Sequence, residues 1–156
     1  HNFYNALNDK DLVGAYNLLD SSQILQNTQE GVKLQETWEN DYNKAGDFAA
    51  KADVGGIKNT LEKYMNIKSK LMSIATIMSW CYLTQLNVSL KRKFEQKIIE
   101  KGIKNYILYF GLTDQITTYF NAFSKEYPDT KLNLESQVQG SMEKWKPSMI
   151  VKSILD

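Results

Sequence analysis

The side chains that most often carry enzyme or metal chemistry are scarce in this sequence. It contains one His, His1, and one Cys, Cys81. Zinc sites draw their ligands mainly from Cys and His, and an activated Ser or Cys nucleophile needs a neighbouring base. The Glu-x-x-His pairs of di-iron bundles are absent. We therefore expect no catalytic residue, no metal, no cofactor and no enzyme activity, and we interpret Cys81 as a small core residue.

Carboxylates and a glycine pair are the remaining routes to enzyme chemistry. Glu36, Glu39 and Asp41 lie together, but Asn, Lys and Thr surround them. A solvated helix face is therefore favoured over an acid–base pair, which needs two environments that separate the pKa values. Gly55-Gly56 lacks the Gly-Lys-Ser/Thr of a phosphate-binding loop and the third glycine of a dinucleotide fingerprint. We interpret this pair as a helix stop.

A row of lysines is the clearest charge pattern. Spacings of three and four residues place its members on one helical face, where they could neutralise nucleic-acid phosphates. Arg92 is the only Arg beside eighteen Lys, and base recognition relies mainly on Arg. The row therefore predicts non-specific nucleic-acid binding, with a solvated face as the simpler interpretation. Its members are Lys93, Lys97, Lys101 and Lys104.

Charge is also divided unevenly along the chain. Residues 1–53 carry nine acidic and four basic side chains, whereas residues 54–104 carry three acidic and ten basic ones. The two parts can neutralise each other within one domain, or they can steer charged partners. Intramolecular neutralisation is the simpler interpretation.

Aromatic residues are numerous for a helical protein. The chain has three Trp, nine Tyr and six Phe. Aromatic side chains at helical spacing usually pack in the core, but Tyr and Trp also anchor protein–protein contacts. The candidates for a protein-interaction surface are Trp38, Tyr42, Tyr109 and Trp145.

The elements that position these groups are organised around Leu71–Leu90, a stretch without a charged side chain between Lys70 and Lys91. Twenty helical residues reach roughly 30 Å, the thickness of a bilayer core. However, its polar residues recur at three and four positions and form one seam of a helix. We expect a buried bundle helix, with membrane insertion and an oligomer interface as alternatives. The seam consists of Ser69, Ser73, Thr76, Trp80, Thr84 and Asn87.

Helical spacing of apolar residues runs through most of the chain, and strand-like alternation is nowhere sustained. The sequence predicts one all-α domain, residues 1–156. It is expected to be a helical bundle of about five to seven helices, two of them long, around a central apolar helix near residues 57–90. A break is expected in residues 87–92.

Capping residues and helix breakers place the other ends. Asp9 and Ser22 are expected to cap the first helices, and a long helix is expected from Ser22 to about Asp53, with Gly31 and Gly46 as sites of bends. Gly111 and Tyr127-Pro128 are expected to end the later helices, Thr113-Asp114 to cap one, and Ser148 to begin a terminal turn.

These features predict a non-enzymatic α-helical interaction or structural protein that acts through a protein–protein surface and can self-associate. One alternative is a nucleic-acid-packaging or coat-type protein that uses the basic row from Lys91 to Lys104. Another is a helical-bundle sensor or carrier that holds a small apolar ligand beside Trp80 and Tyr82. A membrane is the partner expected least.

Overall fold

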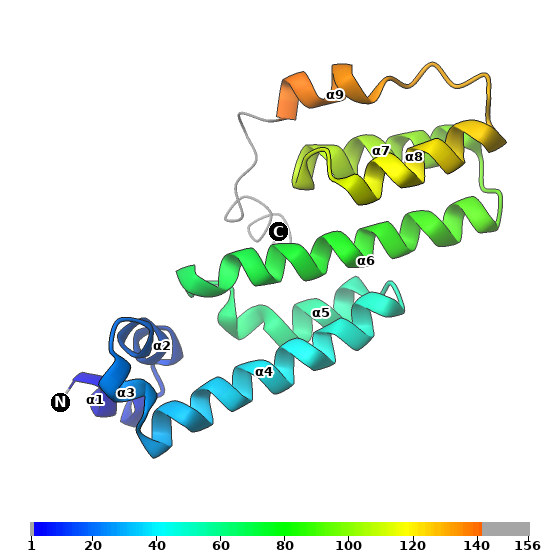
Figure 1. Ribbon diagram of the computed structural model, residues 1–156. Coiled ribbons are helices and arrows are strands. Elements are labelled where there is room, and N and C mark those ends of the chain that lie inside the picture. Colours follow the sequence, from blue (N-terminus) through cyan, green and yellow to red (C-terminus); the bar gives the residue numbers. More distant parts are fainter. Residues whose placement is uncertain (1, 142–156) are drawn as a thin grey trace.

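The described part of the chain is built entirely from helices and their connections. The computed structural model describes residues 2–141, and the side chains of residues 2–137. In this range there are nine α-helices, two 3₁₀ turns and no strand (Figure 1). The all-α prediction is confirmed, with more and shorter helices than expected. The α-helices are α1 (Asn2–Asn8), α2 (Leu12–Asp20), α3 (Gln23–Gln26), α4 (Gln29–Ala50), α5 (Val54–Leu61), α6 (Leu71–Lys91), α7 (Gln96–Phe110), α8 (Asp114–Glu126) and α9 (Leu134–Ser141).

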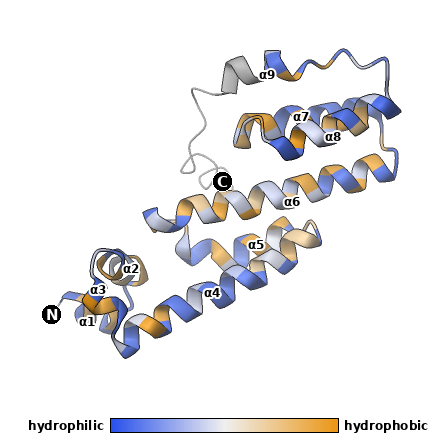
Figure 2. Cartoon of the chain, viewed as in Figure 1, coloured by the Kyte–Doolittle hydropathy of each residue, from blue (hydrophilic) through white to orange (hydrophobic). Residues whose placement is uncertain are grey.

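Helix α6 lies in the middle of the described structure (Figure 1). It packs against α4 and α5 on one side and against α7 and α8 on the other. Helix α9 packs on α7, and α1 to α3 gather at the N-terminal end of α4. The uncharged stretch therefore forms the central helix, as predicted, and hydrophobic residues recur along its length (Figure 2).

Only one side of α6 is fully covered. Cys81 is buried, whereas Trp80 is 50% exposed and Thr76 and Asn87 are exposed. The polar seam is thus the outward side of the helix, and Trp80 is its largest apolar member. The buried side chains of α6 are Ile74, Ala75, Ile77, Met78, Cys81 and Leu86.

The segment before α6 differs from the expectation of one helix beginning near Ile57. Helix α5 ends at Leu61, and two 3₁₀ turns, η1 (Glu62–Tyr64) and η2 (Lys68–Lys70), precede α6. Tyr64 is fully buried here, and its hydroxyl hydrogen-bonds to a side chain of α4. This tertiary contact fixes a compact turn where helical spacing of apolar residues predicts a continuous helix.

One glycine-based prediction is wrong, and the bends expected at two other glycines do not interrupt a helix. Helix α4 runs without interruption through Gly31 and Gly46. Gly55-Gly56 lies inside the first turn of α5 and does not end a helix. A Cβ atom on Gly56 would lie 2.4 Å from a ring carbon of Phe48, so the absence of a side chain serves close packing of α5 on α4.

Three helices end on a non-glycine residue in the left-handed conformation. Lys10, Ala52 and Lys93 have φ values of 58°, 58° and 54° after α1, α4 and α6. At Ala52 the following N–H, that of Asp53, donates to the Phe48 carbonyl at 2.9 Å, and the Ala52 N–H donates to Ala49 at 3.0 Å. This is the Schellman hydrogen-bond pattern, which usually contains glycine. None of these three left-handed residues is a glycine, so the sequence did not mark these helix ends.

The residue after the first two of these corners caps the next helix. The Asp11 carboxylate accepts from the Gly14 N–H, and the Asp53 carboxylate accepts from the Gly56 N–H. The predicted cap at Asp9 is therefore wrong by two residues, since Asp9 lies in the turn directly after α1, where its N–H donates to the Asn5 carbonyl.

Replacing Ala52 with glycine is expected to raise the free energy of unfolding by about 0.5–1 kcal/mol. The left-handed conformation costs a non-glycine residue roughly 1–2 kcal/mol, and the extra freedom of glycine in the unfolded chain offsets about half of that gain. Urea unfolding followed by circular dichroism measures the change. Ala50→Gly, two residues earlier and still helical, is the control and is expected to lower stability by up to about 1 kcal/mol.

The remaining helix ends lie close to their predicted positions. Helix α6 ends at Lys91, within the predicted break, and Ser22 caps α3. Gly111, with φ +78°, follows α7, and the Thr113 hydroxyl accepts from the Ile116 N–H at the start of α8. Helix α8 ends just before Tyr127-Pro128. The predicted turn from Ser148 lies outside the described residues.

Candidate functional site

A groove of about 860 Å³ runs along the outward side of α6. We call it the α6 groove. Helix α4 forms one wall, and the end of α7 with the start of α8 forms the other. The floor is formed by α6, with Thr76 and Trp80 from the polar seam and other α6 side chains beside them. Its lining includes Tyr42, Gly46 and Asp47 on α4, Met72, Trp80 and Leu83 on α6, and Tyr106, Phe110 and Thr113 at the α7–α8 end.

Trp80 is the main apolar feature of the groove. A Cβ atom on Gly46 of α4 would lie 3.7 Å from the Trp80 ring, so the indole lies close to the α4 backbone. Half of the side chain nevertheless remains open to solvent. Met72, two turns earlier on α6, is 53% exposed. Both side chains line the groove and are about half exposed, and Thr76 lies between them along the helix.

Two tyrosines hold the walls of the groove in place. The Tyr42 hydroxyl donates to the Ser73 carbonyl at 3.1 Å, which joins α4 to α6. The Tyr106 hydroxyl lies 3.0 Å from the Thr113 hydroxyl, which joins α7 to the α8 cap. Burial raises the pKa of both phenols above the usual value, partly offset for Tyr106 by hydrogen bonds. Both groups therefore remain neutral at physiological pH.

The lining of the groove is mainly apolar and uncharged. Among its described lining residues, Asp47 is the one charged side chain, and none is a His or Cys. Across residues 2–141, no group of three or more His, Cys, Asp or Glu side chains is placed to hold a metal ion. The lining combines apolar carbon with neutral hydroxyl and amide groups, a composition suited to binding an apolar partner.

The three predicted interaction residues that the structure describes do not form one surface. Trp38 and Tyr42 are neighbours on α4, with ring centroids 5.3 Å apart, and Tyr42 lines the groove. Trp38 is half-buried between Tyr64 and the Lys70 amino group, which lies 5.0 Å from its ring. Tyr109 stacks on Tyr82 at 6.4 Å, and neither residue lines the groove. The fourth candidate, Trp145, lies outside the described residues.

From the sequence, Trp80 was assigned to the polar seam and to a possible ligand site but not to an interaction surface, and Met72 was overlooked as a surface residue. The signal was present in the polar seam, where a Trp among Ser and Thr at helical spacing faces outward. Pairing Trp80 with Tyr82 was the misleading step. Residues two apart on a helix point in nearly opposite directions, so the two rings line different faces.

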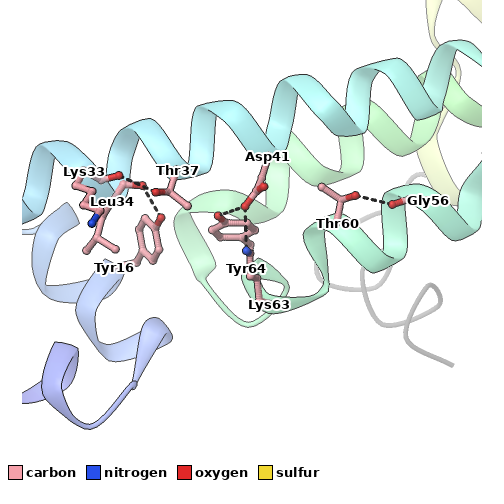
Figure 3. A network of polar contacts seen from close by, with 9 residues as sticks. All are labelled: Tyr16, Lys33, Leu34, Thr37, Asp41, Gly56, Thr60, Lys63 and Tyr64. Atoms are coloured by element: carbon pink, nitrogen blue, oxygen red, sulfur yellow. Dashed lines mark hydrogen bonds and ion pairs between the residues drawn. The ribbon is translucent and has the colours of Figure 1, made fainter.

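The carboxylates that could have formed an acid–base pair are placed differently from a catalytic pair. Asp41 accepts a hydrogen bond from the Tyr64 hydroxyl at 2.6 Å and lies 3.1 Å from the Lys63 amino group (Figure 3). Partial burial opposes ionisation, but these two donors outweigh it, and the pKa of Asp41 falls below its usual value. Glu36 and Glu39 are exposed. Asp41 therefore serves as a structural anchor between α4 and the turn after α5.

The lysine row is exposed, as its spacing predicts. Lys97, Lys101 and Lys104 lie on the outward side of α7, and Lys93 occupies the corner between α6 and α7. Glu100, one of two acidic residues within this row, accepts a hydrogen bond from the Thr130 hydroxyl. The row is thus a separate surface from the α6 groove.

This chain matches no protein-family model, no curated protein and no solved structure. None of the helices in residues 2–141 combines the length and apolar character required to span a membrane. The α6 groove and the lysine row are therefore the two surfaces from which function is inferred.

Proposed function

We propose that this protein is a non-enzymatic interaction module whose α6 groove binds an amphipathic helix of a protein partner. The observation that carries the proposal is the half-exposed Trp80 in a mainly apolar groove that the similarly exposed Met72 also lines. Tryptophan is among the residues that contribute most to protein–protein affinity when a partner excludes water from them.

The length of the groove supports a helical partner. Its floor extends from Met72 to Leu83, a distance of about 16 Å along a helix axis. This length matches three turns of a bound helix, which would present side chains at positions i, i+3, i+4 and i+7. A small apolar ligand, the alternative, would be expected to leave part of this open floor in contact with water.

The charge of the groove indicates what the edge of the partner helix carries. Asp47 lies at the α4 wall among neutral lining residues. A Lys or Arg beside the apolar stripe of the partner would pair with it, whereas an acidic residue there would be repelled. The preferred partner is therefore an amphipathic helix with a basic flank.

Trp80→Ala is expected to weaken binding of such a helix by at least about tenfold, because truncation of a central Trp commonly removes 2 kcal/mol or more. The probe is a designed helical peptide with Leu at i, i+3, i+4 and i+7 and flanking Lys, followed by chemical-shift mapping on the labelled protein. The shifts are expected at α4 and α6 residues of the groove. Ile24→Ala, at a side chain that is 81% exposed on α3, is the matched control and should leave affinity unchanged.

A second comparison tests the charge. A peptide with flanking Glu is expected to bind more weakly, and Asp47→Asn to reduce that difference. Equal affinity of wild type and Trp80→Ala would exclude the groove as the binding surface. Light scattering that shows dimers lost on Trp80→Ala would instead assign the groove to a second copy of this chain.

A further inference from the structure

The corner between α6 and α7 combines clustered positive charge with exposed apolar side chains. Phe94 is 44% exposed and Ile98 is 56% exposed, although both are large and apolar. The basic residues on either side of these two side chains in the sequence are also exposed. We define the basic corner as Lys91, Arg92, Lys93, Phe94, Lys97 and Ile98.

The backbone of this corner is firmly held. The Phe94 N–H donates to the Ser89 carbonyl at 3.1 Å, and the Lys93 N–H donates to Leu90 at 3.2 Å. The Phe94 carbonyl accepts from the Tyr127 hydroxyl at 2.9 Å, which ties the corner to the end of α8. The exposed Phe94 side chain therefore projects from a fixed turn, which lowers the entropic cost of inserting it into a partner.

Positive charge dominates this part of the chain. Residues 88–104 contain six basic and two acidic side chains. One of the two acids, Glu100, is half-buried and hydrogen-bonded to Thr130, and the other, Glu95, is exposed at the start of α7. The exposed charge that a partner meets is thus strongly positive.

We propose that the basic corner binds an anionic membrane surface, with Phe94 and Ile98 inserted into the lipid interface. Lys and Arg near a bilayer are attracted to acidic headgroups, and their long side chains reach the headgroups while neighbouring apolar groups are buried. A nucleic acid would satisfy the charges but offer no apolar surface for Ile98. The two apolar side chains are therefore the features that favour lipid. This surface is independent of the α6 groove.

The first test is co-sedimentation with vesicles at about 0.1 M salt. Vesicles of phosphatidylcholine with about 30 mol% phosphatidylserine are expected to bind at least tenfold more protein than phosphatidylcholine alone. The double variant Phe94→Ser/Ile98→Ser keeps every charge and is expected to lose about tenfold of this binding. Ile24→Ser/Val32→Ser, at exposed apolar residues of α3 and α4, is the matched control and should bind as wild type.

Site-specific labelling reports insertion directly. Burial, together with the charge of Asp53, raises the pKa of Cys81 to about 11, so this thiol is protected from labelling in the folded protein. A polarity-sensitive dye on Ile98→Cys is expected to shift to the blue with anionic vesicles, while the same dye on Ile24→Cys should not shift.

Results of two kinds, with vesicles and with DNA, would overturn the proposal. One is equal binding to both kinds of vesicle, or binding that Phe94→Ser/Ile98→Ser leaves intact. The other is salt-sensitive binding to a random DNA duplex without binding to vesicles, which would assign the basic corner to nucleic acid.

Discussion

Gly31→Ala is expected to lower the free energy of unfolding by about 2–3 kcal/mol. A Cβ atom at this position would lie 2.0 Å from the Leu25 carbonyl oxygen and 2.9 Å from Cδ1 of Leu19. The carbonyl cannot move freely, because it accepts the Thr28 N–H at 3.1 Å in the corner between α3 and α4. Moving the carbonyl away from the new methyl group would therefore break the hydrogen bond that holds the corner.

Gly46→Ala provides the control within the same helix. Its new Cβ atom would make ordinary contacts, 3.7 Å to Trp80 and 3.8 Å to Ile77. Alanine is favoured over glycine in a helix by about 0.5–1 kcal/mol, so this variant is expected to be more stable than wild type. Urea unfolding of both variants should give changes of opposite sign. A neutral Gly31→Ala would contradict the close approach of α4 to the preceding corner.

The difference between these glycines shows which features of the fold the sequence could predict. Ends marked by local chemistry were located, as with Gly111, Thr113 and Pro128, because a left-handed residue, a capping hydroxyl or a missing N–H acts within one turn. Gly31 and Gly46 look alike in sequence, yet one meets a backbone carbonyl and the other an indole. Their roles depend on contacts with α3 and α6, which local pattern does not encode.

The corner at Ala52 and the turn at Tyr64 were missed for the same kind of reason. Alanine does not indicate a left-handed conformation in the sequence. The free-energy cost of adopting that conformation is offset by the packing of α5 on α4. Tyr64 fits a helical stripe, but its hydroxyl is bound by Asp41, twenty-three residues earlier. A long-range hydrogen bond of this kind overrides helical periodicity without changing the local sequence pattern.

The candidate site was predictable to a lesser degree than the fold. The sequence grouped Trp80 with the polar seam of α6, but the expectation of a buried helix did not foresee that half of this side chain is exposed. The groove itself depends on how far α4 and the α7–α8 end stand apart, which is set by side chains on those helices. Tyr42 was chosen as an exposed anchor, and the structure places it at the wall with its hydroxyl bound to Ser73.

Tyr64→Phe is expected to lower the free energy of unfolding by about 1.5–3 kcal/mol at neutral pH, the range for a hydrogen bond to a charged group. The ring contacts with Trp38 and Tyr16 are kept, so the loss comes from the hydroxyl that donates to Asp41. Burial and this bond raise the pKa of Tyr64 far above its usual value, which keeps the donor proton in place at every pH tested.

The effect is expected to depend on pH with a defined sign. The pKa of Asp41 in the folded protein is below the ordinary value of 3.8, so ionised Asp41 stabilises the fold. This stabilisation is complete above about pH 4 to 5 and is lost as the pH falls through the folded-state pKa. The difference between wild type and Tyr64→Phe should therefore be largest at pH 7 and shrink towards pH 3.

Tyr42→Phe supplies the matched control for this prediction. Its hydroxyl donates to the Ser73 carbonyl, a neutral acceptor that does not titrate. The expected loss is about 0.5–1.5 kcal/mol and the same at pH 3 and pH 7. Urea titrations at both pH values, with Asp41→Asn in a double-mutant cycle, separate the two cases. If Tyr64→Phe lost as much stability at pH 3 as at pH 7, the charge of Asp41 would not be what holds the turn after α5 against α4.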